Sequence, residues 1–231
     1  MNKYDNTLSS NILKEKIDLV FKDYFKIEDD IEDIIKTEQF NGEESTSKFK
    51  DHLNKKLKGV NKNRIYELEK VTRDILSGLQ HRDLDKIEDK FLIKGKHITI
   101  MDVLDDKKGL NNTNEFKKRT IKSNDILLRI KGQIGPAVLI TEKEQDMYYY
   151  NDLVRIRVDF DQIIPQYLCL YLNSYIGKYF LNKFSKSKSM NYINIGSVKE
   201  VPILTTMMID QWKIVRNYFN RININKVEKI D

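Results

Sequence analysis

The sequence is poor in the residues that build disulfides, metal clusters and loop-rich domains. Its 231 residues include three prolines and one cysteine, Cys169, so no disulfide can form within the chain and a reducing compartment is expected. The three histidines, His52, His81 and His97, are too far apart in sequence for the usual spacing of zinc ligands. No apolar run approaches the roughly 20 residues that span a bilayer, and no signal peptide opens the chain. We therefore expect a cytoplasmic protein without membrane contact.

Signatures of catalysis are also missing. The sequence has no Gly-rich phosphate-binding loop that ends in Gly-Lys-Ser/Thr, no Asn-Pro-Pro-Tyr-type tetrapeptide of adenine methyltransferases and no Gly-rich cofactor turn. Glu88-Asp89-Lys90 matches the end of a nuclease motif only superficially, because it follows a helical pattern and lacks an upstream Pro-Asp strand. We therefore expect a chain that is not an enzyme by itself and that binds no metal or cofactor.

Charge is the feature that points to a partner. Charged residues make up 33% of the chain and apolar residues 40%, which is enough for a core and favours long solvated helices. The formal net charge is +6 and the pI is near 9.1, which is compatible with a nucleic-acid partner. Residues 1–80 hold 15 basic and 16 acidic groups, whereas residues 81–231 hold 26 and 19. General Lys, Asn and Ile enrichment, as in AT-rich genomes, is the alternative, but the excess lies entirely in the second part.

Apolar residues at spacings of 4 and 3 predict a long helix near the start of the chain. They form one seam with the period of a left-handed coiled coil, and an ordinary bundle helix is the alternative. The residues of this predicted helix–helix interface are Leu13, Ile17, Val20, Tyr24, Ile27, Ile31 and Ile34. A second helical pattern begins at Phe49 and resumes from Ile65 to Leu79. Residues 1–82 are therefore predicted to form a helical hairpin or coiled-coil region.

From about Phe91 the apolar period changes to that of strands. Strands are predicted at 91–93, 97–100, 126–130, 136–141 and 152–159, the last with strict alternation. A broad apolar face predicts a helix over 165–184. The expected fold is α+β, in which 83–206 form a mixed sheet-and-helix domain and 207–231 a C-terminal helix.

Three blocks of sequence follow one another in an order that is typical of one protein family. The first, Asn124 to Ile140, has two β-rich apolar runs around a basic turn that contains two glycines, which allow positive φ. The second, Tyr192 to Ile203, contains Ile-Asn and Val-Pro-Ile, and the third is Asp210-Gln211, which opens the helical tail. Over about residues 90–220 these blocks resemble the target-recognition domain of specificity (S) subunits of type I restriction-modification systems.

The resemblance implies a subunit that reads double-stranded DNA. Full-length S subunits carry two recognition domains separated by antiparallel helices, and they guide adenine methyltransferase subunits onto which restriction subunits dock. With one recognition domain, this chain looks like a half-sized specificity protein, and two copies could form a homodimer that reads a palindromic, gapped site. S-adenosylmethionine and ATP are expected only on partner subunits, and a nucleoid-associated location in the prokaryotic cytoplasm is expected.

Two polar loops are candidates for contact with DNA phosphates, which bind cations that project from exposed turns. One loop holds three adjacent cations, and the other alternates Lys and Ser before an amide and an aromatic ring. A solvated charge run and a flexible linker are the respective alternatives. The predicted contacts are Lys117, Lys118, Arg119, Lys183, Lys186, Lys188, Asn191 and Tyr192.

The glycine turn of the first block supplies the candidates for base recognition. Arg129, Lys131 and Gln133 alternate along a strand that leads into this turn, so their side chains could share a face. Arginine can bond two guanine acceptors, and glutamine can bond adenine bidentately. An ion pair between Arg129 and a carboxylate such as Asp125 is the alternative. The consecutive tyrosines 148–150 could stack on bases or pack in the core.

Three functions remain open from the sequence. The first is a sequence-specific DNA-binding factor that directs an adenine methyltransferase. The second is a stand-alone plasmid or phage protein that uses the same domain for regulation, segregation or replication. The third is a helical interaction scaffold without specific DNA binding.

Overall fold

The computed structural model describes residues 10–25, 64–86, 92–103, 116–186 and 191–227. Its central element is a four-stranded antiparallel sheet with the strand order β2-β9-β6-β7. The strands are β2 (Thr72–Ser77), β9 (Leu153–Val158), β6 (Ile126–Arg129) and β7 (Ala137–Leu139). The strands expected in 126–130, 136–141 and 152–159 are thus confirmed, and so is the α+β class.

Three smaller strand pairs surround this sheet. They are β1 (Arg64–Glu67) with β10 (Pro202–Thr205), β3 (Leu92–Ile93) with β8 (Tyr148–Tyr149), and β4 (Ile98–Thr99) with β5 (Asp102–Val103). Short 3-10 helices join the strands: η1 (Leu68–Val71), η2 (His81–Lys86), η4 (Gly95–His97), η5 (Lys117–Arg119) and η6 (Glu142–Glu144).

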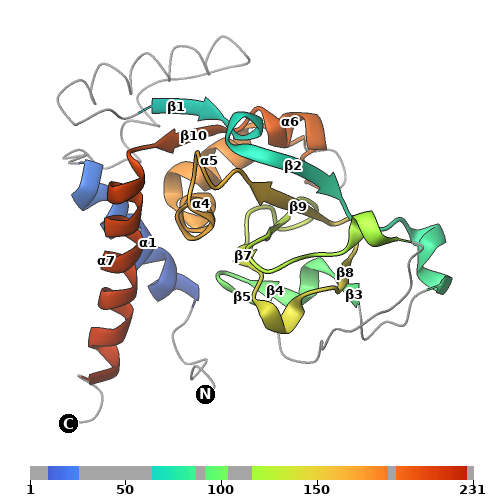
Figure 1. The fold of residues 1–231 in the computed structure, drawn as a ribbon, viewed down its shortest axis with the longest axis horizontal. Coiled ribbons are helices and arrows are strands. Elements are labelled where there is room, and N and C mark those ends of the chain that lie inside the picture. Colours follow the sequence, from blue (N-terminus) through green and yellow to red (C-terminus); the bar gives the residue numbers. More distant parts are fainter. Residues whose placement is uncertain (1–9, 26–63, 87–91, 104–115, 187–190, 228–231) are drawn as a thin grey trace.

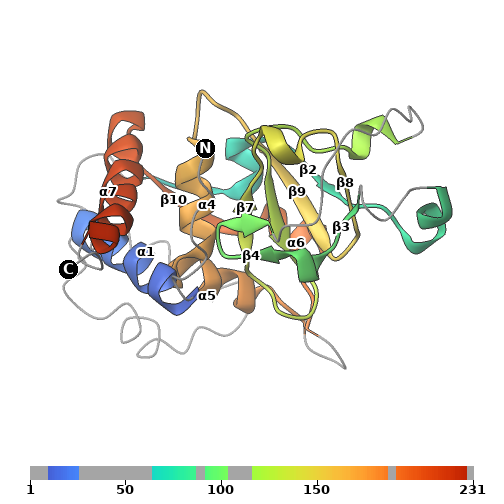
Figure 2. The ribbon, with the colours of Figure 1, turned by 90° about the horizontal axis from the view of Figure 1, so that it is seen from below.

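The α-helices cover one face of the sheet. They are α1 (Ser10–Phe25), α4 (Pro165–Asn173), α5 (Tyr175–Lys183), α6 (Ile195–Lys199) and α7 (Met208–Val227). α1 and α7 lie side by side, and α4 lies between this pair and the sheet (Figures 1 and 2). Among the described residues, no helix is both long and apolar enough to cross a membrane.

The sheet is buried on both faces, which explains why β6 is a continuous apolar run. Ile126 and Leu128 join the core cluster of the helices. Leu127 points to the opposite face, where it belongs to a second cluster with Val138 and Tyr149. The sheet is therefore a rigid layer, and the loops at its ends are held by strands that are packed above and below.

The helix predicted over 165–184 is interrupted at Ser174. The Ser174 hydroxyl accepts a hydrogen bond from the backbone N–H of Gly177 at 3.2 Å and thereby caps α5. Gly177 packs so closely on the preceding helix that a Cβ atom would lie 2.1 Å from the Tyr171 carbonyl oxygen. The break follows from local capping and from a contact that only glycine permits, so the broad apolar face of this segment belongs to two helices.

Two buried amides connect the helices to the rest of the core. Asn173 accepts a hydrogen bond from Ala137 N and donates one to Ala137 O, at 3.1 and 2.8 Å, and thus pairs α4 with the edge strand β7. Gln211 accepts a hydrogen bond from Ile164 N at 2.9 Å and donates one to Thr206 O at 2.9 Å. The glutamine of the third sequence block therefore has a structural role at the start of α7.

The helical prediction for Ile65 to Leu79 is wrong. This segment forms β1, η1 and β2, and Ile75 lies opposite Ile156 of β9. Apolar side chains three and four apart also suit two short strands joined by a 3-10 turn, and pairing with β9 and β10 decides between the two. Residues 1–82 thus supply β2 to the central sheet and β1 to the pair with β10, while the division into regions 1–82, 83–206 and 207–231 stays a prediction.

The seam predicted at the start of the chain packs within the chain where it is described. Ile17 and Val20 are fully buried, and Leu13 and Tyr24 are partly buried against the same cluster. The neighbouring Phe21 lies on two tyrosine rings of α4. This part of the seam is a helix–helix interface of α1 with α4 and α7, so it cannot also serve a second copy. Three members of the seam, Ile27, Ile31 and Ile34, lie outside the described residues.

Candidate nucleic-acid interface

Two of the predicted DNA-binding segments lie next to each other. The turn that follows β6 runs antiparallel to the segment that precedes α6. Gly132 N donates to Asn191 O at 2.9 Å, and Ile193 N donates to Ile130 O at 3.0 Å. These bonds place Lys131 directly opposite Tyr192. The first and second sequence blocks, far apart along the chain, therefore form one surface.

Lys186 joins this pair from the other side. Its backbone N–H donates to Tyr192 O at 2.7 Å, and Tyr192 N donates to Lys186 O at 3.1 Å. Residues directly opposite each other in an antiparallel pair place their side chains on the same face. Lys131, Tyr192 and Lys186 thus form a row in which two ammonium groups flank one aromatic ring. We call this row, with the exposed side chains of Gln133 and Asn191 beside it, the loop edge.

Glycine makes the turn of the loop edge possible. Gly132 and Gly135 have φ angles of 72° and 113°, in the region that residues with a Cβ rarely adopt. The expectation of positive φ at both glycines is confirmed. The side chain of Arg129 braces the turn, because its Nε donates to the Lys131 carbonyl oxygen at 3.2 Å. A Cβ atom on Gly132 would lie 3.3 Å from Nη2 of Arg129.

The row of polar side chains continues beyond Lys131. The Lys131 ammonium donates to Asn151 Oδ1 at 3.1 Å, and Asn151 Nδ2 donates to Gln80 Oε1 at 2.8 Å. Neither amide was singled out from the sequence, because neither lies in a basic or glycine-rich stretch. Only the fold brings the end of β2 and the start of β9 beside the glycine turn.

In the three-cation segment of η5, one cation makes contacts inside the fold. Arg119 donates from Nη1 to the carbonyl oxygens of Ser77 and Gly78, both at 2.6 Å, and so fastens η5 to the end of β2. Lys118 is exposed. The side chain of Lys117 and all of Lys188 lie outside the described residues. Of the η5 cations whose side chains are described, Lys118 is thus the better placed for a phosphate.

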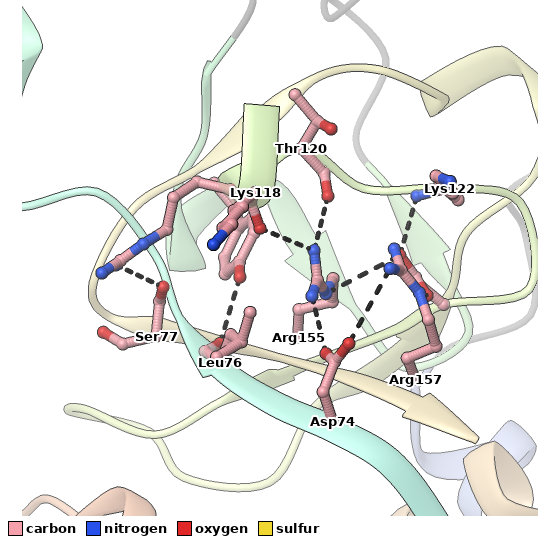
Figure 3. Close-up of polar contacts among 11 residues, drawn as sticks. Asp74, Leu76, Ser77, Lys118, Thr120, Lys122, Arg155 and Arg157 are labelled. Atoms are coloured by element: carbon pink, nitrogen blue, oxygen red, sulfur yellow. Dashed lines mark hydrogen bonds and ion pairs between the residues drawn. The ribbon is translucent and has the colours of Figure 1, made fainter. Parts of the chain in front are cut away.

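A buried network of charges holds η5 and β2 onto β9 (Figure 3). Arg155 is buried, and it donates from Nη1 to Lys118 O at 3.0 Å and to Thr120 O at 2.8 Å. Its Nη2 lies 2.6 Å from Oδ1 of Asp74. The positive charge of β9 is therefore used inside the fold, below the surface that η5 forms.

Arg157 completes this network. Its guanidinium donates to both carboxylate oxygens of Asp125, at 2.8 and 2.7 Å, and this hydrogen bonding raises the pKa of Arg157 above its ordinary value. Asp125, the carboxylate named as an example of an alternative partner for Arg129, thus pairs with Arg157 instead. In the antiparallel pairing of β6 with β9, Ile126 lies opposite Ile156, so Arg157 lies next to Asp125. Arg129 lies at the other end of β6, opposite Leu153.

The remaining predicted contact, Lys183, lies at the end of α5. Its ammonium is 5.8 Å from the centroid of the Tyr179 ring, and burial lowers the pKa of Lys183. A cation that the sequence did not single out, Lys178, packs beside Gly135. Burial is also the first cause that lowers the pKa of Lys178, followed by the nearby Lys14. Lys178 thus places one cation of α5 beside the glycine turn.

Other candidates for chemistry belong to the core. Tyr148 and Tyr149 are fully buried, so the core alternative holds for both, and burial raises the pKa of Tyr149 to about 12. Burial likewise raises the pKa of the Cys169 thiol to about 12. Within the described segments, no three His, Cys, Asp or Glu side chains are grouped so that they could hold a metal ion.

Comparisons with known proteins show what the chain is similar to in sequence and in fold. No family model matches the chain. In sequence the chain is 26% identical over 102 residues to the specificity subunit of the type I restriction enzyme EcoBI from Escherichia coli, a match that covers 44% of this chain and 21% of that protein.

Solved structures agree with the sequence match. The HsdS subunit from Thermoanaerobacter tengcongensis has a TM-score of 0.57 at 12% identity, over 96% of this chain and 46% of that one. A chain from a structure of the assembly and conformational transition of the type I R-M system has a TM-score of 0.56 at 15% identity, over 73% of this chain and 40% of that one. The chain spans less than half the length of these relatives. The predicted resemblance to type I specificity subunits is confirmed, and the shared fold is theirs.

Proposed function

We propose that the chain is a sequence-specific reader of double-stranded DNA that directs an adenine methyltransferase of the restriction-modification type to its site. The observation that carries the proposal is the loop edge. The segments around Lys131 and around Tyr192, which the sequence predicted separately to contact DNA, are hydrogen-bonded neighbours. They lie in a fold that specificity subunits share.

The chemistry of the loop edge suits a duplex. Ammonium groups bind phosphates without regard to sequence and so fix the register of a protein on DNA. Amides such as Gln133 and Asn191 can read the edges of bases in the major groove. Lys131 and Lys186 stand on backbone that is hydrogen-bonded to its neighbours, so little backbone entropy is lost when they bind.

The methyltransferase part of the proposal concerns partner subunits. A recognition subunit contributes orientation, whereas S-adenosylmethionine and ATP would be bound by the methyltransferase and the restriction subunits. The relatives are named as specificity subunits, and this supports a non-catalytic role and a place in the cytoplasm beside the nucleoid. A methyltransferase that co-purifies with the chain and methylates the selected DNA only in its presence would establish this part.

A homodimer is also part of the proposal, but through another surface than the α1 seam. α7 exposes Ile209, Trp212 and Phe219, which are 58%, 51% and 42% accessible and lie at helical spacing along one side. Exposed apolar patches of this kind mark association surfaces. Sedimentation of the parent as a dimer and of Trp212→Ala as a monomer would support a second copy there. A monomeric parent would remove the homodimer and leave a one-part DNA site.

Selection of bound duplexes from a random library at about 150 mM salt tests the central proposal. The parent should enrich a defined motif, in two parts if it acts as a dimer and in one part if it acts alone as a regulator. Lys131→Ala with Lys186→Ala should weaken binding to all duplexes and reduce the salt slope by about 2, since each phosphate contact contributes about 0.9.

The matched control is Lys143→Ala. Lys143 is exposed and lies in η6, beyond the end of the β6–β7 hairpin that is opposite to the glycine turn. Its removal lowers the net charge by one, against two in the double variant, without touching the loop edge, so affinity and salt slope should stay close to those of the parent. A parent that binds DNA weakly and without an enriched motif would overturn the proposal in favour of a scaffold.

A further inference from the structure

Asn151 occupies a fixed position next to the loop edge. It lies between β8 and β9, and its backbone N–H donates to Leu79 O at 3.0 Å. Leu79 is in turn bridged to Tyr150. The next residue, Gln80, is held by its own N–H, which donates to Oδ2 of Asp83 at 2.9 Å. The two amide side chains therefore project from backbone that is hydrogen-bonded on both sides.

The orientation of the Asn151 amide is determined by its partners. A lysine ammonium can only donate, so the atom that faces Lys131 at 3.1 Å must be the carbonyl oxygen, Oδ1. The amino group then faces Gln80, to whose oxygen it donates at 2.8 Å. Each atom of the amide is thus bound once, and the plane of the amide is set by two bonds in opposite directions.

These two bonds leave half of the hydrogen-bonding capacity of the Asn151 amide unused. A side-chain amide has two N–H groups and two lone pairs on its oxygen, and Lys131 and Gln80 use one of each. An amide that offers one donor and one acceptor side by side matches N7 and the N6 amino group of adenine. The Asn151–Gln80 bond lies at the surface, where a base edge could approach.

We propose that Asn151 is a specificity-determining residue that reads an adenine in the major groove, and that Lys131 and Gln80 position it. The assignment rests on the proposed function, because it requires DNA at the loop edge. Lys131 links the two features: its backbone pairs with Tyr192 in the row of the loop edge, and its side chain holds Asn151. A duplex bound along the row would therefore pass within reach of the oriented amide.

Selection of bound duplexes with the full chain and two variants of this residue tests the assignment. Asn151→Ala should lose the preference for adenine at one position of the motif, by roughly 5- to 150-fold against the other bases, with the other positions unchanged. Asn151→Asp keeps the size of the side chain and the contact to Lys131, but it offers only acceptors. Its preference at that position should shift from adenine to cytosine, whose N4 amino group donates. Asn220→Ala, the same change at an exposed asparagine of α7, is the control and should select the parent motif.

The outcomes separate the assignment from the function on which it rests. If the parent selects a motif and Asn151→Asp selects the same base at every position, Asn151 does not read DNA while the proposed function stands. If Asn151→Ala loses all binding, the base that Asn151→Asp selects tests the assignment: cytosine at that position supports it, and an unchanged adenine contradicts it. If the parent selects no motif, the proposed function fails and the assignment fails with it.

Discussion

Replacing Arg155 by methionine should destabilise the fold more than any exposed charge removal on the same sheet. The Arg155 side chain is 3% accessible, and its guanidinium donates to Lys118 O, Thr120 O and Asp74 Oδ1. Methionine fills a similar volume but donates nothing. Two backbone oxygens and one carboxylate would therefore lose a donor in a place that water does not easily reach.

The size of the effect follows from the three lost contacts. A buried acceptor left without a donor costs about 1–3 kcal/mol, which gives about 2–6 kcal/mol for the two carbonyl oxygens. The Asp74 side chain is 34% accessible, so water can replace much of its lost contact and we add nothing for it. For a domain of this size 1 kcal/mol corresponds to about 2–4 °C in Tm. Arg155→Met should thus lower Tm by roughly 4–24 °C.

Thermal and urea unfolding, followed by circular dichroism, measure this loss. The control is Arg73→Met on β2, where the arginine is 60% accessible and its closest carboxylate contact is 3.8 Å. This exposed pair is worth about 0–1 kcal/mol, so Tm should change little. If the two variants melt within 2 °C of each other, roughly 1 kcal/mol at this size, the network around Arg155 does not hold η5 as argued.

Three further changes probe other parts of the fold. Gly177→Ala should lower the free energy of unfolding by roughly 1–3 kcal/mol, because the new Cβ would lie 2.1 Å from Tyr171 O; urea unfolding measures it. Burial raises the pKa of Asp18 above 3.8, so its contribution to stability is complete below that pH and is lost as pH rises through the folded pKa. Asp18→Asn, which keeps an acceptor for Tyr175 N, should therefore gain stability over the parent between about pH 3 and pH 7 in a series of melts. Gln211→Leu leaves two buried backbone groups without partners and should cost at least about 2 kcal/mol by urea unfolding.

Three of the four strands of the central sheet, β6, β7 and β9, could be predicted because their sequence patterns leave little choice. The apolar run of β6 and the period-two alternation of β9 fit a strand with both faces covered and fit no amphipathic helix of that length. The segment from Ile65 to Leu79 could not be predicted in the same way. Its apolar spacing suits a helix as well as a strand pair, and the choice depends on β9 and β10, which lie far along the chain.

The candidate interface was predictable where a backbone signal existed. The glycines of the β6 turn predicted a turn with positive φ, and this turn and Lys186 of the Lys/Ser stretch both belong to the loop edge. Asn151 and Gln80 gave no such signal, because an amide in a polar loop has no preferred partner until the fold supplies one. Their bond joins residues 71 positions apart, and no local rule connects them.

Basic residues that hold elements together inside the fold are not available to bind DNA, so the net charge alone overstates a nucleic-acid surface. The excess of basic residues in 81–231 suggested a nucleic-acid surface, but Arg119, Arg155 and Arg157 donate to carbonyl oxygens and carboxylates inside the fold. These arginines suit the task because a planar guanidinium with several donors can bridge two or three fixed acceptors. The row of the loop edge instead uses Lys131 and Lys186, compact charges on flexible stems that can follow a phosphate backbone. The geometry of the two side chains thus explains why these arginines connect elements inside the fold, whereas the lysines of the loop edge provide outward charge.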